Sequence, residues 1–215
     1  HEIYKAGWIM SLIESDMDGD GDSDIVASDR RGAASGVLWL ERPGPDGLKG
    51  TWPEHRIGAG GAEVMFLDLG ASGNSLPTDI FTAVKPNEIH RFRHSPVTAE
   101  GWSTVVIKVE SPLGVGSAKG IRTGDLDLDG RIDIAYSCEG AHPPKRGLVW
   151  LSDQGPNNPV RWVVRDISGP EGIKFDRLEF LDLDGDGDLD VVTCEENAGP
   201  ESRGLGVIWY ENPHR

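Results

Sequence analysis

The stretch Asp182-Leu183-Asp184-Gly185-Asp186-Gly187-Asp188-Leu189-Asp190 decides the fold of this chain, and Val191-Val192 follows it directly. It places five carboxylates within nine residues, and so many close acids repel one another without a counter-charge. Acids at alternate positions, a glycine at a sharp bend and a final acid are typical of a calcium loop. The same phrase recurs at 16–24 and 125–133. The sequence therefore predicts three metal loops.

These loops belong to a longer internal repeat. The loop-opening residues Asp16, Asp125 and Asp182 have a fourth relative at Asp68, and consecutive members are separated by 52, 57 and 57 residues. Each repeat contains short phrases that are rich in β-branched and aromatic residues and are bounded by Gly, Pro, Asn or Asp, which is typical of strands. Four antiparallel strands per repeat of this length indicate a propeller blade.

The predicted fold class is therefore all-β: a β-propeller of four-stranded antiparallel blades, with four blades in this chain. We expect a single domain over 1–215, with blades at about 5–58, 59–111, 112–169 and 170–215.

The two ends of the chain leave two alternatives open. His1-Glu2-Ile3 matches His55-Arg56-Ile57, the end of a fourth-strand phrase, whereas the last repeat stops after its third phrase. Residues 1–4 could complete the last blade and close a four-bladed ring, which hides the strand edges. Alternatively, these are the final blades of a longer propeller, with further blades or domains missing. A start inside a strand, without the Trp that begins the phrase, favours truncation. The first residue, His instead of Met, indicates a processed, trimmed or truncated chain.

The Asp-x-Asp-x-Asp-Gly-x-x-Asp loop, repeated together with a Gly-x-x-Trp strand, resembles the FG-GAP or VCBS repeat family. Phrases such as Leu205-Gly-Val-Ile-Trp-Tyr-Glu-Asn-Pro213 resemble bacterial secreted or lipid-anchored members. The resemblance covers essentially the whole chain and implies a relation to seven-bladed propellers. The family includes integrin heads, lectins and propellers attached to carbohydrate-active enzymes, so it implies no single function.

Loop position assigns the metal ligands. Positions 1, 3, 5 and 9 offer side-chain oxygens and position 7 a backbone carbonyl, and this oxygen-only set favours about three Ca²⁺ ions over zinc, copper or Mg²⁺. An EF-hand is excluded because position 12 is not Glu and lies within a strand. We expect Gly70 and Ser72 to leave the second blade without calcium. The assigned residues are Asp16, Asp18, Asp20, Asp22 and Asp24; Asp125, Asp127, Asp129, Arg131 and Asp133; and Asp182, Asp184, Asp186, Asp188 and Asp190.

Charge and composition exclude several partners. The net charge of −15 argues against nucleic acid or an anionic membrane surface. No apolar run is long enough to span a membrane, so no membrane insertion is expected. Cys138 and Cys194 occupy equivalent regions of two repeats; they are expected to be buried thiols, with a disulfide as the alternative.

The tryptophans divide into recurring and non-recurring positions. Trp39, Trp150 and Trp209 recur in the third phrase, which predicts inter-blade core. Trp8 does not recur. It either packs at a blade edge, which general burial statistics favour, or stacks on a sugar ring.

A binding site is expected at the ends of the inner strands that lie opposite the metal loops. The residues there are polar and do not repeat from blade to blade, so the scaffold does not require them. The alternative is a solvated rim with mutual salt bridges. His142 and Lys145 could act as base and electrophile in a lyase, although an isolated loop histidine is weak support. The candidate ligand-binding residues are Asp29, Arg30, Glu63, Lys85, Lys119, Glu139, His142, Lys174, Asp176 and Glu195, with Glu88 and Glu196 beside them.

These observations together predict a calcium-stabilised, extracytoplasmic binding module at the cell surface, in the periplasm or outside the cell. Millimolar calcium outside the cell would keep even weak loops filled. A carbohydrate or protein ligand is expected, with carbohydrate preferred. A polysaccharide lyase-like enzyme and a purely structural module are the alternatives, and the sequence favours a non-catalytic role.

Overall fold

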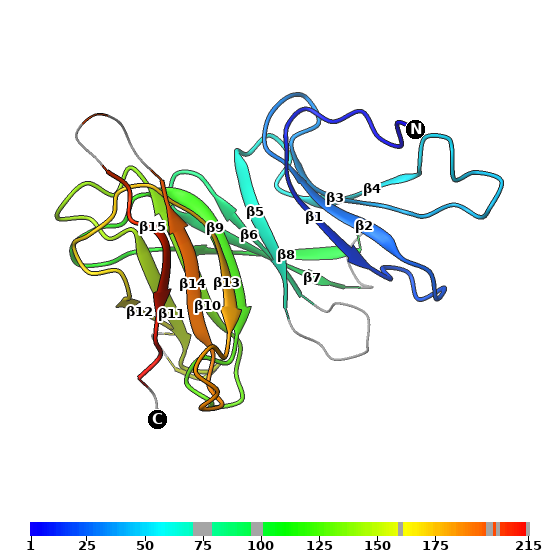
Figure 1. Cartoon of the computed structure of the whole chain (residues 1–215). Coiled ribbons are helices and arrows are strands. Elements are labelled where there is room, and N and C mark those ends of the chain that lie inside the picture. Colours follow the sequence, from blue (N-terminus) through cyan, green and yellow to red (C-terminus); the bar gives the residue numbers. More distant parts are fainter. Residues whose placement is uncertain (71–78, 96–100, 159–160, 197–199, 201–202, 214–215) are drawn as a thin grey trace. The chain divides into compact units, whose positions relative to one another are not determined.

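The computed structural model of the chain describes residues 1–70, 79–95, 101–158, 161–196, 200 and 203–213. Within these residues the secondary structure consists of β-strands only (Figure 1). The first blade comprises β1 (Ile9–Ser15), β2 (Asp24–Asp29), β3 (Gly36–Leu40) and β4 (Glu54–Gly58). The second comprises β5 (Val64–Leu69), β6 (Asp79–Val84), β7 (Glu88–His94) and β8 (Trp102–Lys108). The third comprises β9 (Ser117–Gly124), β10 (Asp133–Glu139), β11 (Leu148–Asp153) and β12 (Trp162–Asp166), and the fourth β13 (Phe175–Leu181), β14 (Asp190–Glu195) and β15 (Gly206–Tyr210).

Each sheet follows the order of the chain. Strands pair antiparallel with their sequence neighbours, in the orders β1-β2-β3-β4, β5-β6-β7-β8 and β9-β10-β11-β12. The fourth sheet has three strands, β13-β14-β15, within the described residues. Four meandering antiparallel sheets confirm the predicted class, an all-β fold of the β-propeller type with four blades.

The chain divides into two compact units of two blades each. Unit 1 contains His1–Lys85 and Ile89–Ile107, and unit 2 contains Pro86–Glu88 and Lys108–Arg215. In each unit the innermost strand of the later blade packs against the inner hairpin of the earlier blade: β5 against β1 and β2, and β13 against β9 and β10.

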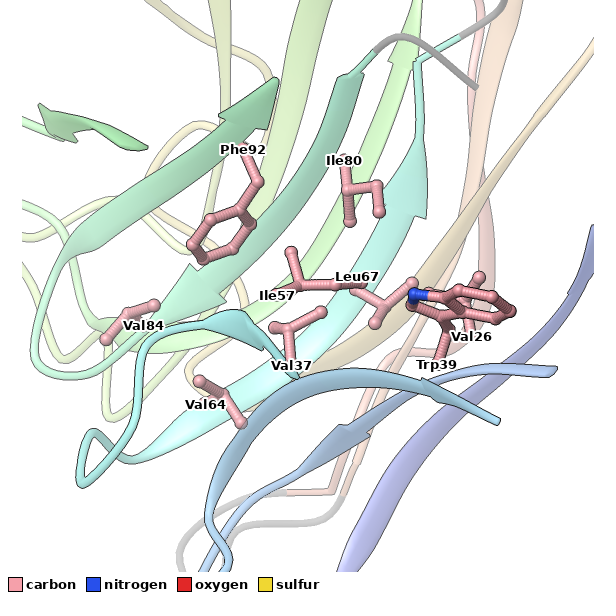
Figure 2. Packing of buried hydrophobic residues seen from close by; sticks show 9 residues of the cluster. All are labelled: Val26, Val37, Trp39, Ile57, Val64, Leu67, Ile80, Val84 and Phe92. Carbon is pink, nitrogen blue, oxygen red and sulfur yellow. The ribbon is translucent and has the colours of Figure 1, made fainter. Parts of the chain in front are cut away.

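The core of unit 1 lies between its two blades, as Figure 2 shows. Val37 and Trp39 of the first blade belong to the same buried cluster as Val64 and Phe92 of the second. Gly58 ends β4 beside this cluster, and a Cβ atom there would lie 2.4 Å from the Phe92 ring. The alternating apolar residues of the short strands thus meet across the blades, as the strand pattern predicted.

Unit 2 has its own core, centred on Phe175 and Leu178 of β13 with Ala135, Leu148 and Val191. One expectation for this unit is wrong. Trp209 is 46% exposed, whereas its repeat partner Trp39 is 9% exposed. The reason is that β15 is an edge strand in the described residues, so nothing there covers the outer side of Trp209.

The remaining expectations concern the termini, the cysteines and the membrane. The Ile3 carbonyl accepts a 2.9 Å hydrogen bond from the Trp52 amide, and Ile3 packs on the first blade. Closure of a ring by residues 1–4 stays a prediction. Cys138 is buried, Cys194 is partly buried and both are free thiols. No described helix is long and apolar enough to cross a membrane.

Candidate functional site: acidic loops and a polar rim

Three acidic groups lie at one end of the inner hairpins, and each could hold a metal ion. The groups are Asp16, Asp18 and Asp24; Asp125, Asp127 and Asp133; and Asp182, Asp184 and Asp186, with candidate ligand atoms within 4.8 Å of one another. Each predicted loop is thus represented by three of its carboxylates. Position 5 is absent from the first two groups and position 9 from the last, so the grouped positions differ between loops.

The loop backbone folds through local hydrogen bonds from amides to aspartates. In the fourth blade the Asp182 carboxylate accepts the Gly185 amide at 2.8 Å, and Asp184 accepts the Asp186 amide at 3.2 Å. These are Asx turns, which the Asp-x-Asp-Gly pattern favours. Position 4 has positive φ in every loop, with Gly19 and Gly185 in two of them, but Leu128 (φ 57°) occupies it in the third.

The position 9 aspartates connect three strands. Asp133 is fully buried, and its carboxylate accepts the Leu126 amide at 3.3 Å and the Asp153 amide at 2.9 Å. Asp24 and Asp190 accept the equivalent pairs of amides. Because one amide lies in the loop and the other lies at or just after the end of the third strand, this residue fixes the loop against the sheet.

The third loop shows why a cation fits this donor set. Asp127 Oδ1 is buried without a hydrogen-bond partner among the described residues, and such an atom is costly unless a cation or water satisfies it. Burial raises the pKa of Asp133 to about 6, and the charge of Asp127 contributes to that increase. Burial also raises the pKa of Asp24. An ion bound between these oxygens would relieve both the repulsion and the desolvation.

Other predicted ligands have protein partners. Asp129 pairs with Arg131 at position 7 of the same loop, and Asp22 pairs with Arg42 at 3.0 Å. Arg131 also donates from Nε to the Asp153 carbonyl at 2.6 Å. Asp129 at position 5 and Asp22 at position 7 thus form ion pairs within the protein. Metal ligation by positions 5 and 7 stays a prediction.

The second blade carries a different counter-charge. Residues 71–78, including Ser72, lie outside the described residues, but both outer acids are described. Asp79, whose side chain is 4% exposed, accepts two hydrogen bonds each from Arg91 and Arg93 of β7, at 2.7–3.1 Å. Burial alone would raise the pKa of Asp79, but the two guanidinium groups outweigh it and lower the pKa. Two arginines thus neutralise the aspartate that opens this inner strand.

The opposite ends of the inner strands in unit 2 carry the carboxylate–lysine cluster, which we define as Lys119, Glu139, Lys174, Asp176 and Glu196. Lys119 lies 3.5 Å from Glu139 and 3.6 Å from Asp176, and Lys174 pairs with Glu196. An isolated β-bridge between Glu139 and Lys174 connects the two blades at this point. The structure therefore brings together four of the predicted rim residues with Glu196, as mutual salt bridges.

Two acids of this cluster, Asp176 and Glu196, are hydrogen-bonded to each other. Burial raises the pKa of Asp176, and its hydrogen bond with Glu196 raises it further. The same hydrogen bond, together with Lys174, lowers the pKa of Glu196. The pair therefore favours a proton on Asp176 and a charge on Glu196.

A cavity of about 350 Å³ opens beside the cluster. Glu139, His142 and Lys174 line it, with Ser117, Gly140 and Ile173. His142 thus joins the predicted rim, whereas Ser117 and Ile173 were not predicted. Ser117 lies eight residues before Asp125, just as the predicted residue Lys174 lies eight residues before Asp182. This repeat spacing was a signal that could have identified Ser117.

Two predicted ligand residues have a structural role. Asp29 is fully buried and accepts the Gly7 and Trp8 amides at 2.7 Å. Glu195 is 3% exposed and accepts the Ile173 and Lys174 amides at 2.9 and 3.0 Å, as well as the Leu205 amide at 2.7 Å. These acids hold the segment that leads into the first strand of the blade, because both oxygens of each carboxylate accept backbone amides.

Unit 1 carries the cationic cluster at the same strand ends, which we define as Trp8, Arg30, Arg31, Glu63 and Lys85. Glu63 Oε1 lies 2.6 Å from Arg30, 3.1 Å from Arg31 and 3.8 Å from Lys85. Hydrogen bonds from Arg30 lower the pKa of Glu63. Trp8 is 49% exposed, and Arg30 and Arg31 lie over its ring, so both its packing at the blade edge and its contact with a sugar stay predictions. Arg31 was not predicted, although it directly follows Arg30.

A larger cavity of about 510 Å³ in unit 2 lies beside the edge strand β15, with Trp150, Trp209 and Tyr210 among its lining residues. Its lining is repeat core left uncovered by the lack of a fourth strand in the described part of this blade. The non-repeating rim is therefore the better candidate for a binding site.

Neither the known protein families nor the curated proteins contain a match to this chain.

Proposed function

We propose that this protein is a calcium-stabilised, extracytoplasmic binding module that recognises carbohydrate through the carboxylate–lysine cluster of unit 2. The resemblance to FG-GAP and VCBS repeats agrees with this role. The observation that carries the proposal is the cavity beside the cluster, because its polar lining residues are not needed by the blade repeat.

The chemistry of the cavity suits a hydroxyl-rich ligand. Glu139 offers acceptor oxygens, Lys174 offers donors, and His142 can do either. Lys119 and Lys174 both have carboxylate partners, so the lysine charges are already balanced within the cluster. A neutral sugar would exchange water for these groups without leaving a charge unpaired, and Ile173 offers an apolar surface for its C–H groups.

Calcium would act as a structural element at the other end of the same strands. The acidic loops end at Asp133 and Asp190, where β10 and β14 begin, whereas Glu139 is the last residue of β10 and Glu196 directly follows β14. Metal binding would therefore support the hairpins and would not contact the ligand. Millimolar calcium outside the cell would keep such loops filled.

Calorimetric titration with neutral oligosaccharides, in calcium and in EGTA, tests the proposal. Glu139→Gln and His142→Ala should each weaken binding about tenfold, the cost of one hydrogen bond to a charged or strongly polar group. Glu171→Gln, an exposed acid of unit 2 outside the cluster, is the matched control. Absence of binding to any oligosaccharide would refute the proposal.

One observation favours an enzyme as the second candidate. Asp176 and Glu196 pair a raised and a lowered pKa, the arrangement that general acid–base catalysis uses. Release of reducing or unsaturated ends from an oligosaccharide, abolished by Asp176→Asn at unchanged stability, would support catalysis over binding.

A further inference from the structure

We propose that the cationic cluster of unit 1 is a second binding site, specific for the carboxylate or sulfate group of an acidic oligosaccharide. Nothing in the repeat architecture requires such a cluster. Its sugar specificity rests on the proposed function, whereas its preference for an anion follows from its own residues.

Cationic side chains gather at one point of unit 1. Arg30, Arg31 and Lys85 converge on the single oxygen Glu63 Oε1. The buried carboxylate of Asp29 accepts the amide of Trp8, the aromatic member of the same cluster. This group of three cationic side chains occurs in a chain whose net charge is −15. A patch that opposes the net charge of the protein is a candidate site for a ligand of opposite sign.

The guanidinium groups of the cluster are held in a fixed geometry. Arg30 and Arg31 lie 4.7 and 5.2 Å from the centroid of the Trp8 ring, within cation–π range. Trp8 itself is anchored by its amide, which donates to Asp29 at 2.7 Å. Planar guanidinium groups held in place recognise carboxylate and sulfate groups through paired hydrogen bonds, at a small entropic cost.

The cluster is accessible to a ligand. The Arg31 side chain is 56% exposed, and Trp8 is 49% exposed. Among the described residues, Arg31 Nη2 donates to Glu63 at 3.1 Å, and a guanidinium group has five N–H donors. The half-exposed indole adds apolar surface next to the charge. A sugar that carries an acidic group offers both a C–H surface and an anion, whereas an acidic peptide offers chiefly the anion.

Calorimetry on the full calcium-loaded chain would use four probes of similar length. These are a chondroitin sulfate hexasaccharide, an unsulfated chondroitin hexasaccharide, neutral xylohexaose and hexaglutamate. We expect both acidic saccharides to bind more tightly than xylohexaose, or the sulfated one alone if the site is specific for a sulfate ester. Arg31→Gln should weaken the acidic saccharides about tenfold or more.

Matched variants keep this test separate from the proposed function. Arg177→Gln removes an arginine of similar exposure that pairs with Glu179 in unit 2, and it should leave affinity within about twofold. Arg31→Lys should recover part of the lost affinity, because it restores the charge without the planar donor fork. Trp8→Leu should also weaken the acidic saccharides.

Each alternative outcome overturns one statement. Xylohexaose binding that depends on Glu139 but not on Arg31, with no gain for acidic saccharides, would refute this inference and leave the proposed function standing. Acidic saccharides that bind through Arg31 without any effect of Glu139→Gln would refute the unit 2 site instead. Hexaglutamate binding as tightly as the acidic saccharides would identify a docking surface for acidic peptides and overturn the sugar assignment.

Discussion

Asp184→Asn should destabilise the protein in calcium and leave its stability almost unchanged in EGTA. Asn keeps the Oδ1 acceptor that receives the Asp186 amide at 3.2 Å, so the Asx turn survives the substitution. What is lost is one charge from the group Asp182, Asp184 and Asp186. The variant therefore separates metal binding from loop folding.

The expected magnitude follows from ligand linkage. A loop that binds calcium only when folded contributes about 2.7 kcal/mol when free calcium is a hundredfold above its dissociation constant. For a chain of this size, 1 kcal/mol corresponds to about 2 to 4 °C in Tm, so loss of one loop should lower Tm by about 5 to 11 °C. In EGTA the variant should match the wild type or exceed it slightly, because one repelling charge has been removed.

The control is Asp79→Asn in the second blade. Here the counter-charges are Arg91 and Arg93, and removal of the acid leaves the largely buried Arg91 without its partner. We expect a loss of about 3 kcal/mol, equal in calcium and in EGTA. Differential scanning calorimetry of both variants in both buffers measures this comparison. An Asp184→Asn penalty that persists undiminished in EGTA would refute the assignment of this loop as a metal site.

Three further variants test other parts of the structure. Leu128→Gly should raise stability by about 0.5 to 1 kcal/mol in urea unfolding, because Leu128 has a φ of 57° in a loop whose relatives use glycine there; a loss would show that its side chain stabilises the loop. The Asp79 pKa is lowered on folding, so its stabilisation should be complete above about pH 4 and should decrease as the pH falls through the folded pKa. The stability difference between wild type and Asp79→Asn, measured in EGTA, should therefore shrink in acid, and a constant difference would contradict the ion pairs. Glu195→Gln should cost about 2 to 3 kcal/mol, because its amide group cannot accept all three backbone amides; loss of ligand binding at unchanged stability would instead favour the ligand contact expected from the sequence.

The fold was predictable because its signals are local. An acidic loop with glycines at its bends defines a hairpin, and repetition at a nearly constant interval defines the blades. The lack of inner acids in the second blade was equally visible. The counter-charge that Arg91 and Arg93 supply to Asp79 was not visible. These arginines lie on the third strand of the blade and contact Asp79 only because the sheet brings the strands together.

The sequence predicted where the rim residues lie, but not which of them hold the scaffold and which are available to a ligand. Asp29 and Glu195 each follow the aspartate that opens the second strand by five residues, and each accepts amides 21 and 22 residues earlier in the chain. They therefore do repeat, and this spacing marks them as part of the scaffold. The contact of Trp8 with Arg30 and Arg31 had no such signal, since it depends on how these side chains stack in three dimensions.

The same backbone position carries opposite chemistry in the two units. Trp8 and Lys174 each donate their amide to the buried acid of the blade, and their carbonyls accept the amides of Arg30 and Glu196 at 2.8 and 2.9 Å. The scaffold thus fixes the main chain identically in the first and fourth blades. The side chains at these positions are Trp and Arg in one blade, and Lys and Glu in the other.

In each blade this segment is already held by the buried acid and by one backbone–backbone hydrogen bond. Its outward side chains are therefore free to vary without cost to the blade. A repeat that fixes the backbone and varies the side chains can present different ligand groups on one architecture. Exchange of the variable pairs tests this separation directly: Lys174→Trp combined with Glu196→Arg should leave Tm within about 2 °C, the effect of surface changes below about 0.5 kcal/mol. The same double variant should shift the preference of unit 2 from neutral toward acidic saccharides. A large loss of stability would show that the carboxylate–lysine cluster is itself part of the scaffold, and that its residues were selected for folding rather than for a ligand.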